Sequence, residues 1–239
     1  MPTPIYTVRC LGNEHIAESV HVMRFTKPGD FSFLPGQFVL FSVPSLDDPD
    51  DVQPRAYSIA STPDEKELLF VIKIKEGGRA GAWVEQCLTE GMDVRMQGPM
   101  GMFSFDPLWR GGSLLLCTGV GVAPFRSMIV SALESGYAKP MDLCVGCFSQ
   151  EYLFWLDMFE GLAAAHSNFR FHVTLSDPKE PWRGNRGYVQ DIVPSIVPDC
   201  RQRSVYACGN PLMTGAIKKL CLGGAWDVPK ERFHMEGYV

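Results

Sequence analysis

One short stretch of this sequence brings together three side chains that could bind a nucleotide. "PRAYSIAS", from Pro54 to Ser61, carries an arginine, a tyrosine and a serine in what otherwise reads as a short strand. Strand alternation places Arg55 and Tyr57 on one face with Ile59, where the arginine could clamp a phosphate and the tyrosine ring could stack on a flat ligand. The alternative is an edge strand with a solvated arginine and a tyrosine that covers a barrel, and the stretch alone favours it.

Two further stretches combine turn residues with the end of a predicted strand. "LCTGVGVAPF" has Gly119 and Gly121 at a strand-to-helix turn, where glycine lets the backbone approach a ligand, and Pro124 in the first helical turn. A phosphate could bind there, but any such turn can need glycines, so this pattern alone leaves both interpretations open. "YACGNPLM" places Cys208 at the end of the last strand before a helix. A buried cysteine is usually a small hydrophobic residue, but this one faces the same crevice as the Gly119 turn.

The first half of the chain is rich in short runs typical of β-strands. Up to about Asp106, these runs are separated by Pro, Gly and Asp, which predicts a small antiparallel β-barrel. A single helical stretch, residues 80–91, follows Gly77 and Gly78 and is expected to cap the barrel. The predicted strands are "IYTVRCL", "SVHVMRF", "QFVLFSV", "RAYSIAS", "LLFVIKI" and "DVRMQ".

The second half alternates short apolar strands with helical segments. Four strand-helix units follow residues 107–112 and predict an α/β domain with a parallel sheet and helices on both faces. Such sheets bind ligands at the carboxyl ends of their strands, where the Gly119 turn and Cys208 both fall. We therefore predict two domains, a β-barrel over 1–106 and an α/β domain over 107–239. The units are "SLLLCTG" with "VAPFRSMIVSALESG", "MDLCVGCF" with "EYLFWLDMFEGLAAAH", "FRFHVTLS" with "GYVQDIVPSIV", and "SVYACG" with "NPLMTGAIKKLCLGG".

The composition excludes several classes of partner. The chain has 239 residues and a formal net charge of −5, and it lacks the basic cluster that a nucleic-acid partner needs. We expect a soluble, cytoplasmic protein, because the chain has no leader-like start and no run approaching the roughly 18 apolar residues of a membrane helix. Cys144 and Cys147 fall on a predicted strand without a second pair, so we predict core thiols and no metal site.

Taken together and in this order, these stretches resemble the ferredoxin-NADP reductase-like flavoproteins over the whole chain. "RAYS" resembles the flavin motif of that family, which implies that Arg55 binds the phosphates of FAD, Tyr57 stacks on the isoalloxazine and Ser58 lies near flavin N5. "GGRAGAWV" resembles the second flavin motif, a glycine pair before a helix, with Gly81 and Ala82 where hydroxyl residues are common. The other flavin contacts that the resemblance implies are Ala56, Ile72, Lys73, Gly78, Arg79, Ala80, Gly81 and Ala82.

"TGVGVAP" and "CGNPLM" resemble the nicotinamide-nucleotide motifs of the same family. The resemblance implies that Gly119 and Gly121 approach the pyrophosphate and that Cys208 lies beside the nicotinamide. In the tail "FHMEGYV", Glu236 and Tyr238 have the spacing of the Glu-x-Tyr end of plant-type members, whose aromatic ring shields the flavin, and Val239 adds one residue beyond it. We expect the catalytic residues to be Ser58, Cys208, Glu236 and Tyr238, with further nicotinamide-nucleotide contacts from Thr118, Pro124, Ser176, Gly209, Asn210 and Met213.

The resemblance implies an oxidoreductase that takes a hydride from NAD(P)H onto FAD and passes single electrons to a separate carrier, such as ferredoxin, flavodoxin or an oxygenase component. We expect NADH to be favoured, because Asp177 directly after Ser176 would repel the 2′-phosphate of NADPH, although Arg183 and Arg186 follow in the same loop. Two alternatives stay open. One is a reductase that releases reduced free flavin, a branch that "ASTPDE" and "PWRG" also resemble, and the other is a flavin-binding subunit of a larger complex.

Overall fold

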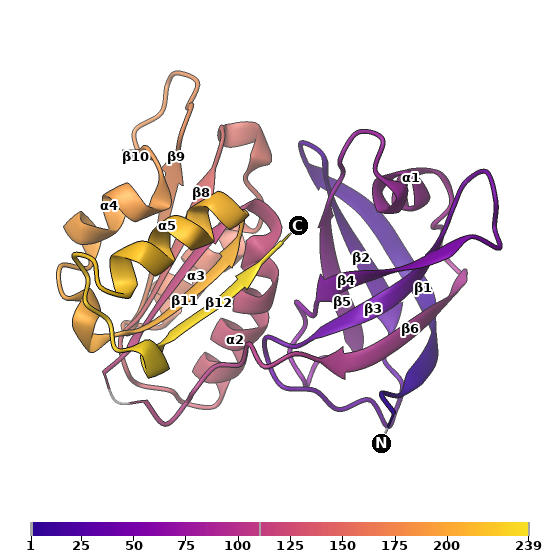
Figure 1. Cartoon of the computed structure of the whole chain (residues 1–239), viewed down its shortest axis with the longest axis horizontal. Coiled ribbons are helices and arrows are strands. Elements are labelled where there is room, and N and C mark those ends of the chain that lie inside the picture. The colour runs from indigo at the N-terminus through magenta and orange to yellow at the C-terminus, as the bar shows by residue number, and fades with distance from the viewer. Residues whose placement is uncertain (1, 110, 239) are drawn as a thin grey trace. The chain divides into compact units, whose positions relative to one another are not determined.

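The chain folds into two compact units, each described separately below (Figure 1). The computed structural model describes residues 2–109 and 111–238. The first unit contains residues 2–105 together with Ala123–Ser131, and the second contains residues 106–122 and 132–238. Among the described helices, none combines the length and the apolar character that crossing a bilayer requires.

The first unit is an antiparallel barrel of six strands, which confirms the predicted fold of this half. The strand order is β4-β3-β6-β1-β2-β5, and every pairing is antiparallel. The two outer strands meet, because the N–H of Ala60, just beyond β4, donates to the carbonyl oxygen of Leu69 in β5 at 2.8 Å. The strands are β1 (Ile5–Ala17), β2 (Val20–Thr26), β3 (Phe38–Pro44), β4 (Val52–Ser58), β5 (Glu67–Lys73) and β6 (Asp93–Met100).

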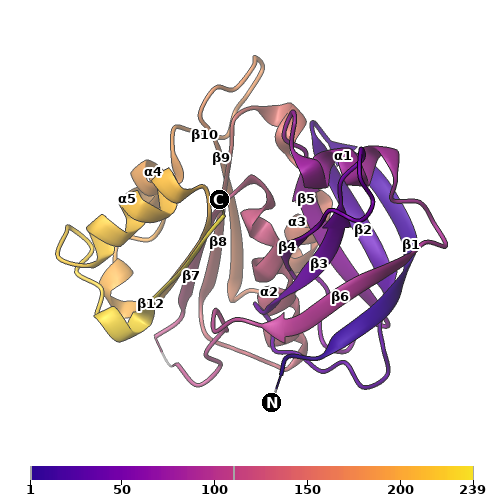
Figure 2. The ribbon, with the colours of Figure 1, turned by 45° about the vertical axis from the view of Figure 1, so that its right-hand side comes forward.

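The barrel interior is built around Phe41 of β3. Alternate residues of this strand are buried, as expected for a strand with one face toward a core. The Phe41 ring centroid lies 4.9 Å from those of Phe25 and Phe70, on two other strands, and 6.4 Å from Trp83 of the helix α1 (Arg79–Gln86). Helix α1 therefore packs on the same aromatic cluster as the sheet, and Figure 2 shows it across one end of the barrel.

Helix α1 is shorter than the sequence predicted. The expected helix ran to Gly91, whereas the observed helix ends at Gln86. The side-chain amide of Asn13 donates to the carbonyl oxygens of Val84 at 2.6 Å and Leu88 at 3.0 Å. The Val84 carbonyl would accept from the next helical turn, so the Asn13 side chain replaces the hydrogen bond that continuation of the helix would require.

The start of the helix α2 (Ala123–Glu134) belongs to the first unit. The Arg126 guanidinium donates to the carbonyl oxygen of Ala60 at 2.8 Å and to both carboxylate oxygens of Glu65 at 3.0 and 2.8 Å. Burial alone would raise the pKa of Glu65, but the hydrogen bond and charge of Arg126 outweigh it and lower that pKa. The loop after β4 is thereby fixed by a charge-assisted, bidentate contact.

The second unit is the predicted parallel sheet, with strand order β10-β9-β8-β7-β11-β12. Its central strands are buried almost throughout, as expected for a sheet covered on both faces. One face packs against α4 and α5, and on the other the Phe159 ring of α3 lies 5.2 Å from Phe171 of β9 (Figure 1). The elements are β7 (Ser113–Thr118), β8 (Met141–Cys147), α3 (Leu156–Ala165), β9 (Phe169–Leu175), β10 (Asn185–Arg186), α4 (Val189–Ile196), β11 (Ser204–Gly209), α5 (Pro211–Cys221) and β12 (Phe233–Gly237).

Two features of this unit differ from the sequence prediction. Helix α3 begins at Leu156 rather than Glu151, because Trp155 has left-handed backbone angles, with φ of 57°, that break the run. The tail forms an additional strand, β12, which pairs in parallel with β11 and places Glu236 opposite Cys208. Its five residues are too short and too mixed in polarity for a sequence pattern to identify them as a strand.

Asp142 is a buried carboxylate near the amino ends of the parallel strands. It is 0% exposed, and Arg170 of the neighbouring strand donates to it at 2.7 and 2.8 Å. His172 lies 3.2 Å and Arg203 3.6 Å from its oxygens. Burial would raise the pKa of Asp142, but hydrogen bonds from His172 and Arg170 and the charges of Arg170 and Arg203 hold that pKa below its ordinary value.

We expect Asp142→Asn to lower the free energy of unfolding of the second unit by about 3 kcal/mol at neutral pH, because it leaves a buried cluster without its anion. The lowered pKa means that this contribution is complete above the pKa of an unfolded aspartate, roughly 3.9, and is lost as the pH falls through the folded-state pKa. Urea unfolding at pH 7 and pH 3 measures both effects. Asp93→Asn, in an exposed pair with Arg9, is the control and should change little; an equal loss in both variants would contradict the prediction.

Candidate functional site

Strand β4 holds the arginine and tyrosine of the first predicted site. Gln53, Arg55 and Tyr57 are half-buried along one side of this strand, whereas the residues between them are exposed. The Arg55 guanidinium donates to the carbonyl oxygen of Pro54 at 2.9 Å and to Oε1 of Gln53 at 2.7 Å. In the described part of the chain, none of the ion pairs includes Arg55. Both acceptors are neutral, so the charge of Arg55 remains available to an anion.

The Tyr57 ring extends the aromatic cluster of the barrel toward the same side of β4. Its centroid lies 5.8 Å from that of Phe41, with the ring planes at 49°. Burial raises the pKa of Tyr57 well above its ordinary value, which keeps the phenol neutral. Strand β4 ends at Ser58, and both Ser58 and Ile59 are buried, with Ile59 in the barrel core cluster against which Tyr57 packs.

The amino end of α1 presents backbone N–H groups without a protein cap. Gly77 has a φ of +68° and open space where a side chain would stand, and Gly78 at the N-cap provides no side-chain hydrogen bond. The first turn has no acidic residue, so its dipole favours an external anion. At Gly81 a Cβ would lie 3.1 Å from Cγ2 of Ile74, a tight contact that the Ile74 side chain would have to relieve.

Two other predicted flavin contacts differ in exposure. Ile72 on β5 is 6% exposed, and its side chain belongs to the barrel core. Lys73 next to it is exposed. Arg79, the first residue of α1, forms an ion pair with Asp51, a contact that the sequence patterns did not reveal.

In the second unit, the carboxyl ends of β7 and β11 approach each other through glycines. A Cβ on Gly121 would lie 2.4 Å from the carbonyl oxygen of Cys208, and one on Gly209 would lie 2.6 Å from Oγ1 of Thr118. The Asn210 N–H donates to the same Thr118 oxygen at 3.0 Å. The two predicted motifs are therefore brought together, and Gly121 is required by backbone packing. At Gly119, which has a φ of +51°, a Cβ would meet no other atom within 4 Å, so packing does not require glycine there.

Cys208, Glu236 and Tyr238 also lie together in this unit. Cys208 is 0% exposed, Glu236 is its register partner on β12, and the Tyr238 N–H donates to the carbonyl oxygen of Gly209 at 3.0 Å. Burial raises the pKa of the Cys208 thiol far above its ordinary value, although a hydrogen bond with the Tyr238 side chain acts in the opposite direction. Cys208 is therefore a neutral thiol near pH 7 and has no thiolate character.

The remaining predicted nicotinamide contacts are more scattered. The Asn210 side chain caps α5 by accepting from the Leu212 N–H at 2.8 Å, and Met213 is 7% exposed in the core. Ser176 is exposed just beyond β9, and Pro124 falls in the α2 segment that belongs to the first unit. The roles of these residues in binding stay predictions.

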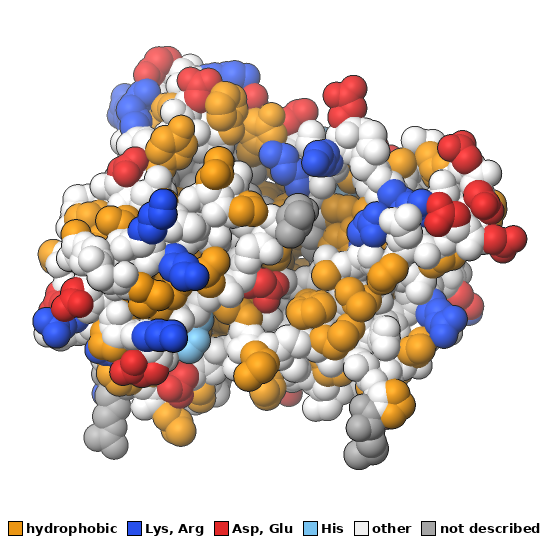
Figure 3. Space-filling view, viewed as in Figure 1, with side chains coloured by type: hydrophobic (Ala, Val, Ile, Leu, Met, Phe, Trp, Pro, Cys, Tyr) orange, Lys and Arg blue, Asp and Glu red, His pale blue; other side chains and the backbone are white. Residues whose placement is uncertain are grey.

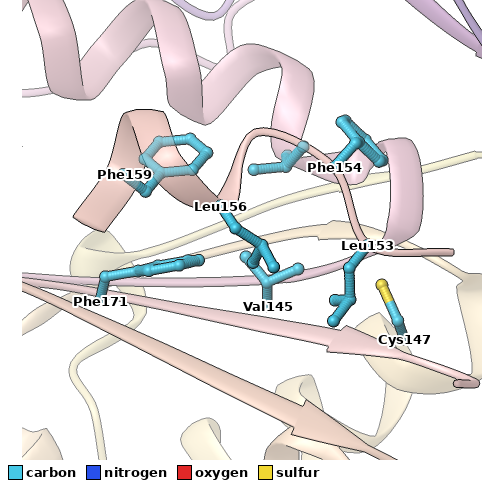
Figure 4. A pocket seen from close by; sticks show the side chains of 8 residues that line it. Val145, Cys147, Leu153, Phe154, Leu156, Phe159 and Phe171 are labelled. Carbon is cyan, nitrogen blue, oxygen red and sulfur yellow. The ribbon is translucent and has the colours of Figure 1, made fainter. Parts of the chain in front are cut away.

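Cys144 and Cys147, both on β8, have different environments. Cys144 is buried in the core beneath α4 and α5, whereas Cys147 lines a small apolar pocket with Leu153, Phe154 and Phe171 (Figure 4). The pocket volume of about 10 Å³ leaves room for one water molecule at most. Within the described residues, no group of three His, Cys, Asp or Glu side chains is placed to hold a metal ion.

Comparison with known proteins identifies both units. Residues 8–105 match the family model of an oxidoreductase FAD-binding domain, and residues 115–219 match that of an oxidoreductase NAD-binding domain. The chain is 34% identical to ferredoxin-NADP reductase B of Sorangium cellulosum over 87% of its own length and 86% of that protein. The chain belongs to the ferredoxin-NADP reductase-like flavoprotein family. It is accordingly an oxidoreductase, with an FAD-binding and an NAD(P)-binding domain.

Other members of this family are longer than the present chain. The toluate 1,2-dioxygenase electron transfer component of Pseudomonas putida is 30% identical over 90% of this chain but only 61% of its own length. The solved Amycolatopsis cytochrome P450 reductase GcoB superimposes with a TM-score of 0.86 and 28% identity, covering 98% of this chain and 70% of that protein. The chain thus spans about three fifths of the dioxygenase relative.

The neutral acceptors around Arg55 and the uncapped start of α1 fit the phosphates of FAD, which leads to the first test of the site. We expect Arg55→Ala to weaken FAD binding roughly ten- to hundredfold, because hydrogen bonds from a charged donor contribute about 1.5–3 kcal/mol each. Flavin content after purification and FAD titration of the apoprotein measure this loss. Arg95→Ala, an exposed arginine on β6, is the control. Equal FAD affinity in the Arg55 variant and the wild type would contradict the assignment.

Proposed function

We propose that the protein takes a hydride from a reduced nicotinamide nucleotide onto FAD and passes single electrons to a separate carrier, such as a ferredoxin, a flavodoxin or an oxygenase component. The observation that carries the proposal is the match of both domains, in order, to relatives named as reductases and electron transfer components. These include a naphthalene 1,2-dioxygenase reductase component and a glycine betaine monooxygenase reductase subunit. The proposal extends to a cytoplasmic location, where NADH is available.

Bound FAD supplies the conversion of a two-electron hydride into single electrons. The chain supplies binding and orientation. In this proposal Arg55 and the first turn of α1 would hold the phosphates, Tyr57 would support the flavin ring and Ser58 would contribute near the reactive part of that ring. Cys208 would lie beside the nicotinamide, and its buried thiol carries no charge that would alter the donor.

The proposal is tested by anaerobic reduction followed by electron transfer. NADH added to the FAD-loaded protein should bleach the flavin absorbance near roughly 450 nm within one turnover. Cytochrome c should then be reduced rapidly only when a ferredoxin, flavodoxin or oxygenase component is added. Failure of all three carriers, with normal bleaching by NADH, would reject the single-electron role while leaving the reductase chemistry intact.

A second candidate, a reductase that releases reduced free flavin, is favoured by one specific contact. Arg79 at the start of α1 is already paired with Asp51, so one of the cations near the expected FAD pyrophosphate is partly neutralised. A protein with a weak hold on its flavin would use it as a substrate. Stoichiometric FAD that survives gel filtration would reject this candidate, and a colourless protein that reduces added flavin would support it.

We further propose that NADH is preferred over NADPH. Asp177 is exposed just beyond β9, where the carboxylate disfavours an additional phosphate. Two nearby cations already have carboxylate partners: Lys179 lies 2.8 Å from Glu151, and Arg186 lies 2.5 Å from Glu180. Arg183, in the same loop, is a cation that would favour the 2′-phosphate of NADPH and so opposes the preference for NADH.

We expect Asp177→Asn to raise kcat/KM for NADPH by about fivefold while changing the value for NADH little, because it removes a like charge at partly screened distance. Steady-state reduction of a dye acceptor with each nucleotide measures the ratio. Asp157→Asn, an exposed aspartate in the first turn of α3, is the matched control. An unchanged NADPH value in the Asp177 variant would show that this carboxylate does not select the donor.

A further inference from the structure

The connection between β3 and β4 is strongly acidic and lies next to the start of helix α1. Asp47, Asp48, Asp50 and Asp51 are all exposed within residues 45–51. Figure 3 shows acidic side chains gathered on the right-hand rim of the first unit, with lysine or arginine side chains beside them. Such a loop repels a phosphate group, so its position beside an expected pyrophosphate site requires an explanation.

Asp51 makes the contact that ties this loop to α1. The Arg79 guanidinium donates to the carbonyl oxygen of Asp51 at 2.5 Å, and its other nitrogen pairs with the Asp51 carboxylate. The Arg79 side chain is only 18% exposed, whereas that of Asp51 is 45% exposed. Arg79 is therefore held at the amino end of α1 by a partner that can move into solvent.

Arg55 on β4 is oriented by a neutral partner rather than by a carboxylate. Gln53, two residues after Asp51, accepts from Arg55 at 2.7 Å and carries no charge. Gln53 thus orients one guanidinium without neutralising it, whereas Asp51 orients the other and neutralises it. The same short segment of chain supplies both partners, a charged carboxylate for Arg79 and a neutral amide oxygen for Arg55.

We propose that Asp51 competes with the pyrophosphate of FAD for Arg79 and so sets how tightly the protein holds its flavin. This inference rests on the assignment of FAD to β4 and α1. When a phosphate approaches, the Asp51 carboxylate must either leave Arg79 or share it with a like charge, and both alternatives reduce affinity. Gln53 imposes no such competition at Arg55, because an amide oxygen does not repel the phosphate.

The test compares FAD dissociation constants of apoproteins by quenching of flavin fluorescence at low ionic strength. Asp51→Asn should bind FAD about three- to tenfold more tightly than the wild type, the range expected for a partly exposed ion pair. Gln53→Glu should bind FAD more weakly by a similar factor, because it creates at Arg55 the competition that Asp51 exerts at Arg79. Added salt should reduce both differences.

Two further variants separate competition from general repulsion. Asp47→Asn removes the same charge from the same loop, and Asp47 forms no ion pair within the described residues, so its FAD affinity should stay within twofold of the wild type. In an Arg79→Ala background, the gain from Asp51→Asn should disappear, because no guanidinium remains to compete for.

The outcomes are distinct. Wild-type affinity or weaker binding in Asp51→Asn overturns the inference, and so does an equal gain in Asp47→Asn or a gain that persists without Arg79. A wild-type apoprotein that binds no FAD would overturn the proposed function itself, whereas wild-type binding with an unaltered Asp51→Asn variant would overturn this inference alone.

Discussion

The packing of Phe41 holds together the two elements on which a flavin site in this chain depends. Its buried ring lies 5.8 Å from that of Tyr57 on β4 and 6.4 Å from that of Trp83 on α1, and it also packs against Phe25 and Phe70. Tyr57 lies two residues from Arg55, and Trp83 lies one helical turn from Arg79. Apolar packing therefore fixes the backbone of β4 relative to that of α1, while Gln53 and Asp51 orient the two guanidinium groups. A polar site on separate loops would lack this constraint.

The second unit uses backbone contact where the first uses side chains. Gly121 packs on the Cys208 carbonyl, and Gly209 packs on Thr118, so the carboxyl ends of β7 and β11 leave no room for a Cβ at either glycine. Any side chain at these glycines would separate the strands' ends. The cysteine between them is consequently buried and neutral. A buried, neutral thiol of this kind is a poor nucleophile.

How far the sequence predicts the molecule depends on the range of the interactions involved. Alternation and turn residues were sufficient for the barrel strands and for the parallel sheet, because these patterns record burial within each element. These local patterns do not predict features that depend on a residue far away in the sequence. Asn13 ends α1 through its side-chain amide, and β12 exists because β11 offers an edge. The pairing of Arg79 with Asp51 was missed for the same reason: 28 residues separate the two in sequence.

The contrast between Asp51 and Gln53 bears on how a flavoprotein balances its fold against its cofactor. An arginine at a phosphate site is an uncompensated charge until the ligand arrives, and a neutral acceptor orients it without removing that charge. A carboxylate partner stabilises the ligand-free protein instead, at the expense of affinity. One segment of this chain combines both arrangements, because the Asp51 carboxylate pairs with Arg79 and the neutral Gln53 side chain accepts from Arg55. Under the proposed assignment of FAD to β4 and α1, Arg55 and Asp51 would make electrostatic contributions of opposite sign to flavin binding.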